Sequence, residues 1–536
     1  MRLARLGRLA AVTATGLVAA GVLAATAAVG ETWVDRWTGA DRTAVGSGQQ
    51  EVAVDPGEDV LVCPRPVRLP RGADVGDDQF GATPVETRSR LAAAISGASG
   101  AITLGRLDGS RRSDLAPGPD AAVTAGEAAG VRALRATPES GGTLGAAGAV
   151  SSRTATGDLR GLAAASCRRP ATDHWLVGGD SEVGSSALLA VQNPSPRPAA
   201  VTLEVFGPAG AVPVGGQGTF TVAAGEQTVV RLDSLAPEQR RLAVHVTAVG
   251  ARVTASLQTQ GIDGLVPAGV DLVEPGAAPA RSLAVTGVVS RGEDLDDEHA
   301  PVLWLVAPGQ DAGSARVGVY GPDGPVRLRG AEEVDLEPGT VVGVPLGGLG
   351  AGTYTVTVDA DVPVTAGARM SVPGTAPEKA VIEDTPYDVA WNAGRSLSDS
   401  GSSTSGQVAL PDGGAGATVV LSAVPGADDR DPDADVVGEV TVTVRGLDAE
   451  GAVADEREVT VQAGTTVELP ASDVGAQVAV VVEAPADAAA GPSLAWGVRL
   501  AGDDGTGDSG TLVATLDPTP ALPSPGDVIV RRVDAS

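Results

Sequence analysis

The chain has 536 residues, 67 acidic against 38 basic side chains, a formal net charge of −29 and only 2% aromatic residues. Nucleic-acid binders concentrate Lys and Arg, and no basic stripe follows the first ten residues, so the composition argues against nucleic acid as a partner. Because 43% of the residues are apolar, the acidity indicates the soluble surface of a folded protein. At about 100–200 residues per domain, the length predicts about three to five domains.

Residues 1–30 have the pattern of a signal peptide or a single transmembrane anchor. Arg2, Arg5 and Arg8 precede a long uncharged stretch that ends near a possible cleavage site at Ala25-Thr26-Ala27. A stretch of about 20 apolar residues can also span a bilayer, so cleavage and retention both remain open. Either alternative places the chain beyond the linker at 31–50 outside the cytoplasm. We therefore expect an extracytoplasmic protein, secreted or anchored to the plasma membrane, with membrane contact only through residues 1–30.

Two cysteines, Cys63 and Cys167, fit an exported chain. A lone pair of cysteines in an oxidising compartment predicts one disulfide. The loop it closes corresponds to about 4–5 kcal/mol in the chain-entropy model. Residues 51–168 otherwise give the weakest signal, with strands expected near Val60–Cys63 and 121–125. We predict a disulfide-stapled β region there, and a degenerate further sandwich remains an alternative.

An internal repeat dominates the rest of the chain. Val205–Gly210 aligns with Val319–Gly324, and Ala224–Val230 aligns with Pro338–Val344, both at an offset of 114 residues. A weaker third copy has its turn at Asp448–Gly451. A repeated order of strands and glycine turns is typical of a repeated structural unit. The repeat predicts three β-sandwiches, over residues 171–275, 282–375 and 380–503.

Apolar and polar residues alternate within each copy, as in Val201–Val205 and Val440–Val444. Alternation of β-branched residues between Gly, Pro and Asp turns is typical of half-buried strands. The sequence thus predicts an all-β protein of tandem antiparallel β-sandwich (immunoglobulin-like) domains after an N-terminal signal or anchor helix. Residues 504–536 are expected to form a C-terminal tail with one possible strand at Val528–Val533.

Four tryptophans stand in expected strands. Trp175 and Trp304 are interpreted as opening the first two sandwiches, Trp391 as opening the third, and Trp496 as part of a closing strand. In so aromatic-poor a chain, we expect these side chains to be structural core anchors, about one in each sandwich.

Residue patterns for catalysis are weak throughout. No G-x-S-x-G nucleophile turn or phosphate-binding glycine loop stands in a suitable context. His174 beside Asp173 is better explained as a buried histidine at a strand start than as a general base. The acidic loops at 293–298 and 428–435 lack the spacing of known Ca²⁺ loops, so solvated loops are favoured. We predict no catalytic residue, no metal site and no cofactor.

Two segments resemble a family of exported actinobacterial proteins of unknown function. They are His174–Gly179 followed by Leu188–Pro194, and Gly157–Ala163 leading to Cys167. The resemblance covers most of the chain beyond the leader. It implies a cell-envelope protein with a signal or anchor, and it brings no catalytic residues.

The expected function is therefore that of a non-enzymatic, exported interaction or scaffold module. The expected partner is a protein or polysaccharide of the cell envelope. Two alternatives remain open: a glycan-binding accessory factor, and an envelope-processing enzyme with its site between sandwiches.

Overall fold

The computed structural model describes residues 49–53, 57–69, 86–328, 333–376, 384–397, 405–426, 430, 436–484, 491–507, 509–523 and 527–531. The chain divides into two compact units, one of them Pro56–Ser524 and the other Met1–Asp55 with Pro525–Ser536. In the smaller unit, β1 (Gln49–Ala53) pairs antiparallel with β38 (Asp527–Arg531). The expected leader at 1–30 lies outside the described residues, as does the linker apart from its last two positions, which begin β1. No helix among the described residues is long and apolar enough to cross a membrane.

The larger unit is nearly all β, which confirms the predicted fold class at that level. Its antiparallel sheets form four face-to-face pairs, each around its own apolar cluster. We call these pairs the first to fourth modules and assign them the described residues within 57–168, 171–275, 280–397 and 405–523.

The strands of the first two modules are as follows. The first module has one sheet in the order β2 (Asp59–Cys63), β7 (Arg132–Pro138), β4 (Ala98–Gly105), β5 (Ser113–Asp114), and another in the order β6 (Ala122–Glu127), β3 (Thr87–Ser96), β8 (Thr143–Thr154), β9 (Gly161–Ser166). The second has β10 (Asp173–Val177), β16 (Ala243–Val249), β12 (Ala199–Gly207), β13 (Gly210–Val212), with β14 (Thr219–Val222) beside β12, and β15 (Gln227–Arg231), β11 (Ser185–Gln192), β17 (Thr254–Asp263), β18 (Val266–Val273).

The third and fourth modules repeat these orders. The third has β19 (Ala280–Ser290), β25 (Gly352–Pro373), β21 (Gly313–Gly321), β22 (Gly324–Val326), with β23 (Val334–Leu336) and β27 (Arg395–Ser396) at its edges, and β24 (Val341–Pro345), β20 (Val302–Val306), β25, β26 (Tyr387–Ala393). The fourth has β28 (Gly406–Ala409), β33 (Ala479–Glu483), β30 (Glu439–Leu447), β31 (Val453–Gln462), and β32 (Thr466–Pro470), β29 (Ala417–Val424), β34 (Ser493–Asp503), β35 (Ser509–Leu516). Short strands β36 (Thr519–Pro520) and β37 (Leu522–Pro523) pair with β28 and β8, and the described helices are the single turns η2 (Gly215–Gly218), α2 (Leu232–Leu235) and η4 (Ala471–Val474).

The common strand order corrects the immunoglobulin-like prediction. In every module the first, fifth and third principal strands share one sheet, and the fourth, second, sixth and seventh share the other. An immunoglobulin constant domain instead places strands one, two, five and four in one sheet. The first module has the same order as the others, so residues 57–168 form a further sandwich of the same kind.

The 114-residue repeat corresponds to one hairpin in two modules. Gly207 pairs with Gly210 across the β12–β13 turn, and Gly321 pairs with Gly324 across the β21–β22 turn. Gly210 and Gly324 have φ angles of 106° and 118°, which L side chains rarely adopt, so the turn requires glycine. Alternation produces the expected burial as well, because β12 buries every second residue over its first half. Each Val or Leu buried in this way contributes about 1.5–3 kcal/mol to stability.

Three placements predicted from the sequence are wrong. Trp304 lies on β20, the second strand of its module, whereas Trp175 lies on β10, the first strand. Trp391 lies on β26, which pairs with β25 and completes the third module instead of opening the fourth. Residues 509–516 form β35 against β34, so the fourth module extends well into the expected C-terminal tail.

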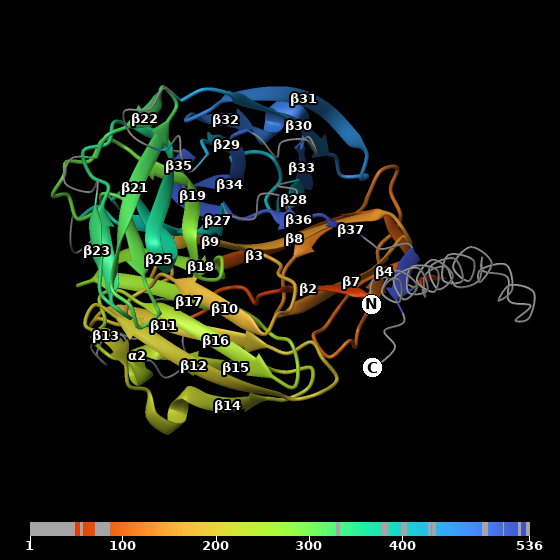
Figure 1. Cartoon of the computed structure of the whole chain (residues 1–536), viewed down its shortest axis with the longest axis horizontal. Coiled ribbons are helices and arrows are strands. Elements are labelled where there is room, and N and C mark those ends of the chain that lie inside the picture. The colour runs from red at the N-terminus through yellow and green to blue at the C-terminus, as the bar shows by residue number, and fades with distance from the viewer. Residues whose placement is uncertain are drawn as a thin grey trace, which may run out of the picture. The chain divides into compact units, whose positions relative to one another are not determined.

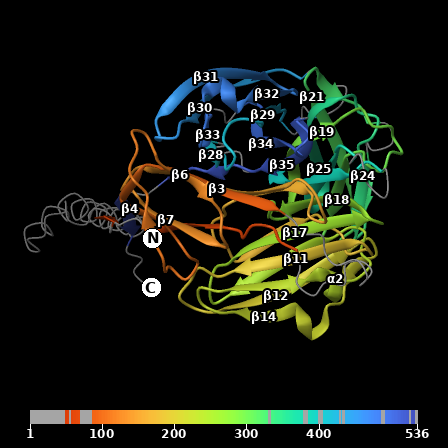
Figure 2. The ribbon, with the colours of Figure 1, turned by 180° about the vertical axis from the view of Figure 1, so that it is seen from behind.

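Each module contacts the next through a hairpin and a glycine turn. A Cβ at Gly339 would lie 3.5 Å from Phe206 of the preceding module, and one at Gly464 would lie 3.6 Å from Tyr320. The circuit closes because a Cβ at Gly118 in the first module would lie 2.4 Å from the carbonyl oxygen of Glu450 in the fourth. Figures 1 and 2 show the orange first module lying between the yellow second and the blue fourth.

Candidate functional site at the junction of the four modules

The last strand of each module lies at a common junction. β9 contacts β18 and β35, and β26 also contacts β18 and β35, so the four strands form a closed circuit. Each of these strands ends a sheet, with its neighbour within the module on one side only. The outward backbone N–H groups of such an edge strand need partners when the strand is buried.

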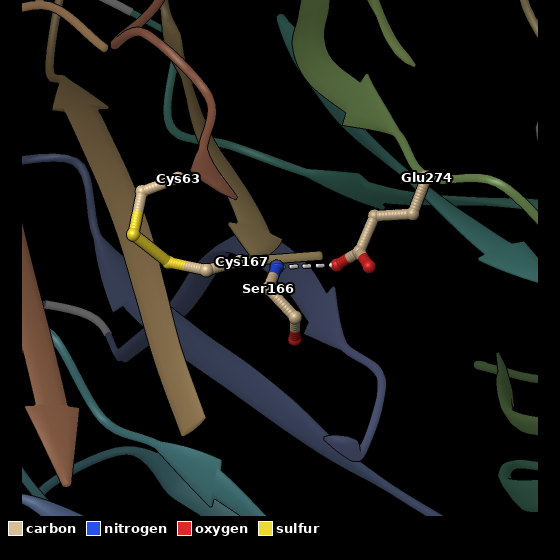
Figure 3. The surroundings of a disulfide bond; sticks show 4 residues. All are labelled: Cys63, Ser166, Cys167 and Glu274. Carbon is tan, nitrogen blue, oxygen red and sulfur yellow. Dashed lines mark hydrogen bonds between the residues drawn. A yellow bond between two sulfur atoms is a disulfide. The ribbon is translucent and has the colours of Figure 1, made fainter. Parts of the chain in front are cut away.

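Three carboxylates from other modules accept these N–H groups along β9. Leu162 N–H donates to Asp388 Oδ2 at 3.0 Å, and Ala164 N–H donates to Asp271 Oδ1 at 3.3 Å. Ser166 N–H donates to Glu274 Oε1 at 2.6 Å, as Figure 3 shows. The backbone N–H groups of alternate residues point toward the same edge of a strand, so the three acceptors lie along one edge of β9, opposite β8.

Two of these carboxylates also bind a third module. Asp388 Oδ2 accepts Val513 N–H of β35 at 2.8 Å, and Asp271 Oδ2 accepts Trp391 N–H of β26 at 2.8 Å. Asp388 therefore joins the third module to the first and fourth, and Asp271 joins the second module to the first and third. Both residues are buried, 0% and 1% exposed. The carboxylates take the place of the strand that would otherwise pair with each edge.

Burial dominates the protonation of this junction. It raises the pKa of Asp388 to about 7, although the hydrogen bonds from the N–H groups of Val513 and Leu162 lower it. It also raises the pKa of Glu274 to about 7, although the positive charge of Arg168 lowers it. It also raises the pKa of Asp271 well above the usual range. Burial in a low dielectric penalises the charged form of each of these carboxyl groups, and at Glu274 the charge of Arg168 opposes that penalty.

We expect the free energy of unfolding to fall as pH rises from about 4 to about 7. Asp388 and Glu274 keep protons in the folded protein that the unfolded chain has already released in this window, so the unfolded state gains relative stability with pH. The expected fall is at least about 1.4 kcal/mol, the equivalent of one pKa unit. Urea unfolding at pH 5 and pH 8 measures it, and equal stability at the two values would contradict the assignment.

Four charged residues lie at one end of the junction, each just after one of the strands β9, β18, β26 and β35. Arg168, Glu274, Arg395 and Asp517 come from the first, second, third and fourth modules respectively. Arg168 pairs with Glu274 and, at 2.8 Å, with Asp517, which also pairs with Arg395. The charges alternate in sign around the cluster, so each module contributes one partner to an ion pair with its neighbours.

A second ion pair lies at the other end of the junction, just before β9 and β35 in the chain. Arg160, 4% exposed, donates to Asp504 Oδ2 at 2.9 Å and to the Thr511 carbonyl oxygen at 3.3 Å. Asp504 also accepts the Thr375 N–H at 3.1 Å. Burial opposes ionisation of Asp504, but hydrogen bonds from Thr506, Arg160 and Thr375 outweigh it and hold its pKa at about 2. The first, third and fourth modules are thus also joined at this end.

The disulfide between Cys63 and Cys167 lies beside the cluster. It joins the end of β2 to the residue after β9, with the two Cα atoms 4.0 Å apart. Figure 3 places it next to Ser166, whose N–H binds Glu274. The disulfide therefore links the two sheets of the first module at the point where β9 contacts the second module.

The packing around Cys167 leaves no room for a side chain at position 148. A Cβ at Gly148 would lie 2.7 Å from Cys167 Sγ, and the Gly148 carbonyl oxygen accepts the Cys167 N–H at 2.7 Å. We expect Gly148→Val to destabilise the protein by about 1–3 kcal/mol through overpacking. Urea unfolding of the oxidised variant measures this, and a stability equal to that of the wild type would contradict the described packing.

A cavity of about 190 Å³ opens between the third and fourth modules, beside Arg395 and Asp517. Its walls include small apolar residues and polar side chains: Ala284, Leu397, Val420, Ala495, Gly497, Pro518, Thr286, Asn392, Arg499 and Thr515. The corresponding space between the first and second modules, beside Arg168 and Glu274, is only about 10 Å³. Related junctions therefore differ in whether they leave space for a ligand.

The four predicted core anchors are all buried, with exposures of 5–6%. Trp496 belongs to the apolar cluster of the fourth module. Trp304 and Trp391, whose ring centroids are 4.7 Å apart, instead pack with the cluster of the second module. Trp391 also donates from Nε1 to Thr259 of that module at 3.2 Å. The expectation of one tryptophan in each core is therefore wrong for these two, which join modules.

The histidines have structural partners. His174 is buried, its Nε2 lies 2.8 Å from the Val253 carbonyl oxygen, and burial lowers its pKa. Asp173 contacts His245 instead of its sequence neighbour, at 2.9 Å, and the His245 ring stacks on Trp175. Among the described residues, no group of three or more His, Cys, Asp or Glu could hold a metal ion. Residues 428, 429 and 431–435 of the second acidic loop lie outside that part of the chain.

A model of a family of unknown function (DUF5719) matches residues 122–472. The chain belongs to this family. Because the match spans the second and third modules and most of the fourth, DUF5719 covers most of the junction but stops before β35. No curated protein matches this DUF5719 chain.

The chain has weak similarity to two solved structures. Thermotoga maritima 1070 has 17% identity and a TM-score of 0.17, covering 22% of this chain and 93% of that one. The Streptomyces avermitilis alpha-L-rhamnosidase complexed with L-rhamnose has 9% identity and a TM-score of 0.12, covering 84% and 55%. At these TM-scores neither likeness informs the fold or the function of the DUF5719 chain.

Proposed function

We propose that this DUF5719 protein is an exported, non-catalytic binding or scaffold protein that acts outside the cytoplasm. The observation that carries the proposal is the Cys63–Cys167 disulfide, which pairs both cysteines of the chain. Disulfides persist in oxidising compartments and are rare in the reducing cytosol. The basic, then apolar, pattern of residues 1–30 supports the same compartment.

The four-module junction supports a scaffold role. Hydrogen bonds and ion pairs from different modules meet at the central strands, which favours a fixed arrangement of the outer hairpins. A fixed arrangement presents several surfaces to a partner at little conformational cost. The partner would be a protein or polysaccharide of the cell envelope.

The cavity between the third and fourth modules favours the glycan-binding alternative over an envelope-processing enzyme. A concave site with a few convergent polar groups is typical of small-ligand binding. Its charged side chains are engaged in ion pairs, since Arg395 pairs with Asp517 and Arg499 with Glu468. The carboxylate of Asp517 in the lining is held in ion pairs with Arg168 and Arg395, which favours binding over acid–base catalysis at this cavity.

Fractionation of cells that express the full chain tests the proposed compartment. Maleimide-polyethylene glycol labelling after denaturation should modify no cysteine without reductant and two after reduction. Protease added to spheroplasts should digest the protein, while a cytoplasmic marker stays intact. Two free thiols in a protease-protected pool would overturn the proposal.

A further inference from the structure

The space between the first and second modules is nearly closed, whereas the space between the third and fourth modules is open. Residues at equivalent strand positions explain this difference. Gln192 on β11 pairs with Gln227, the first residue of β15, and with Thr254 on β17. Ser422 on β29 pairs in the same way with Thr466, the first residue of β32, and with Ala495 on β34. Thr254 therefore corresponds to Ala495.

Two positions further along the strands, Ser256 corresponds to Gly497. Ser256 pairs with Ala190 and Gly497 pairs with Val420, so the register is the same in both modules. The closed space is lined by Gln192, Thr254 and Ser256, and a hydrogen bond of 2.9 Å joins Thr254 Oγ1 to Gln192 Oε1. At these three positions the fourth module has the smaller residue, namely Ser422, Ala495 and Gly497, whereas Val420 is larger than its equivalent, Ala190. Smaller side chains on one sheet face thus open the 190 Å³ cavity.

Three polar atoms of the cavity's lining residues have no hydrogen-bond partner among the described residues. They are Asn392 Oδ1, an acceptor, and the Nε–H donors of Arg395 and Arg499. Asn392 is 5% exposed, and its Nδ2 is already used by the Thr286 carbonyl oxygen at 2.7 Å. Each of these atoms is itself inaccessible, so a ligand binds it only after the side chain turns toward the cavity, and the about 1–3 kcal/mol cost of leaving the atom unpartnered then favours binding.

The remaining features of the cavity define the ligand. Both guanidinium groups already face carboxylates, Asp517 and Glu468, so the site has no excess positive charge for an anion. A cavity of about 150 Å³ holds a benzene ring, so this one has room for a single six-membered ring. Hydroxyl groups both donate and accept, and can therefore satisfy an amide oxygen and two N–H donors together. Ala284, Val420 and Pro518 supply apolar surface for ring C–H groups.

We propose that the cavity between the third and fourth modules binds one uncharged, polyhydroxylated ring, as in a single sugar residue. The inference deepens the proposed function, on which the extracytoplasmic source of the sugar rests. The ligand is either a free monosaccharide or one residue of a longer glycan, and both present the same chemistry to Asn392, Arg395 and Arg499.

Saturation-transfer difference NMR on the purified, oxidised full chain tests the proposal. The probes are methyl glycosides of mannose, galactose, glucose and arabinose, with cyclohexylmethanol as an apolar ring of similar size. We expect at least one glycoside to give a stronger signal than cyclohexylmethanol. A matching oligosaccharide that binds at least tenfold more tightly would assign the site to a longer glycan, and equal affinity would assign it to the monosaccharide.

Two variants locate the binding. A Cβ at Gly497 meets one atom within 4 Å, the Leu516 carbonyl oxygen at 3.4 Å, so Gly497→Val fills space without a severe clash. The double change A495T/G497S introduces Thr and Ser, the residues found at the equivalent positions 254 and 256 beside the closed space. Both variants should weaken glycoside binding at least tenfold, while Ser256→Ala, in the closed junction, should leave it unchanged.

Two outcomes would overturn the inference. One is the absence of a signal from every glycoside at millimolar concentration, and the other is unchanged binding in folded A495T/G497S protein. Because these measurements use purified protein, they leave the compartment assignment intact if they fail. Conversely, a cytoplasmic location would not alter the measured binding.

Discussion

Asp388→Ala is expected to destabilise the larger unit by about 2–6 kcal/mol. The change removes the acceptor for two buried N–H groups, those of Leu162 and Val513, and each unsatisfied group costs about 1–3 kcal/mol. The loss falls on the contacts among three modules, so the urea midpoint should drop for probes in all of them. Urea unfolding followed by tryptophan fluorescence and circular dichroism measures the change.

Asp388→Asn is the matched control. Its amide oxygen can accept both N–H groups, while its NH₂ group takes the position of Oδ1, which has no hydrogen-bond partner among the described residues. We expect the variant to lie within about 1 kcal/mol of the wild type near neutral pH and to show a smaller loss of stability between pH 5 and pH 8. If the Ala and Asn variants were equally stable, the hydrogen-bond role of Asp388 would be wrong.

Loss of the disulfide is expected to have the second large effect. The bond spans 104 residues, and a loop of this length corresponds to about 4–5 kcal/mol from restriction of the unfolded chain. Replacing Cys63 and Cys167 by Ser should therefore lower the free energy of unfolding by about 2–5 kcal/mol, the range seen for native disulfides. Guanidinium unfolding of the double variant measures the loss.

The reduced wild-type protein provides the comparison for the double variant. Reduction should lower the midpoint to a similar extent, because both treatments release β2 from the residue after β9. The double variant should also expose Ser166 N–H to hydrogen exchange, since that group binds Glu274 beside the disulfide. Unchanged stability in both samples would show that the disulfide does not hold this junction together.

Local patterns in the sequence predict the strands well. The alternation at Val440–Val444 became β30, with its valines buried, because a half-buried strand needs one apolar face. The repeated Gly-Pro-x-Gly turn at 207–210 and 321–324 became the same hairpin in two modules. In these segments the local preference and the tertiary structure agree.

The equivalence of strands in different modules is harder to predict from the sequence. Equating Trp175 with Trp304 required an offset of 129 residues, although the repeat itself holds at 114. Keeping the constant offset would have placed Trp304 in the second strand. The turns of the first module differ in length from those of the other modules, so a constant offset does not extend to it.

The junction carboxylates were missed because only tertiary structure gives them partners. Asp271 and Asp388 stand in otherwise apolar strand segments, Val-Asp-Leu-Val and Tyr-Asp-Val-Ala-Trp. A lone acid in a buried strand is a recognisable anomaly, because an isolated buried charge is costly. The anomaly indicates that a partner exists, but the backbone N–H groups that supply it lie over 100 residues away in the chain.

Hydrogen–deuterium exchange of β9 tests most directly the claim that carboxylates from other modules bind its outer edge. Residue-level measurement should find the amides of Leu162, Ala164 and Ser166 as slow as those of the paired core strand β8. The amide of Leu162 should become fast in Asp388→Ala and stay slow in Asp388→Asn. Exchange at these three amides as fast as in the short edge strand β13 would contradict the account.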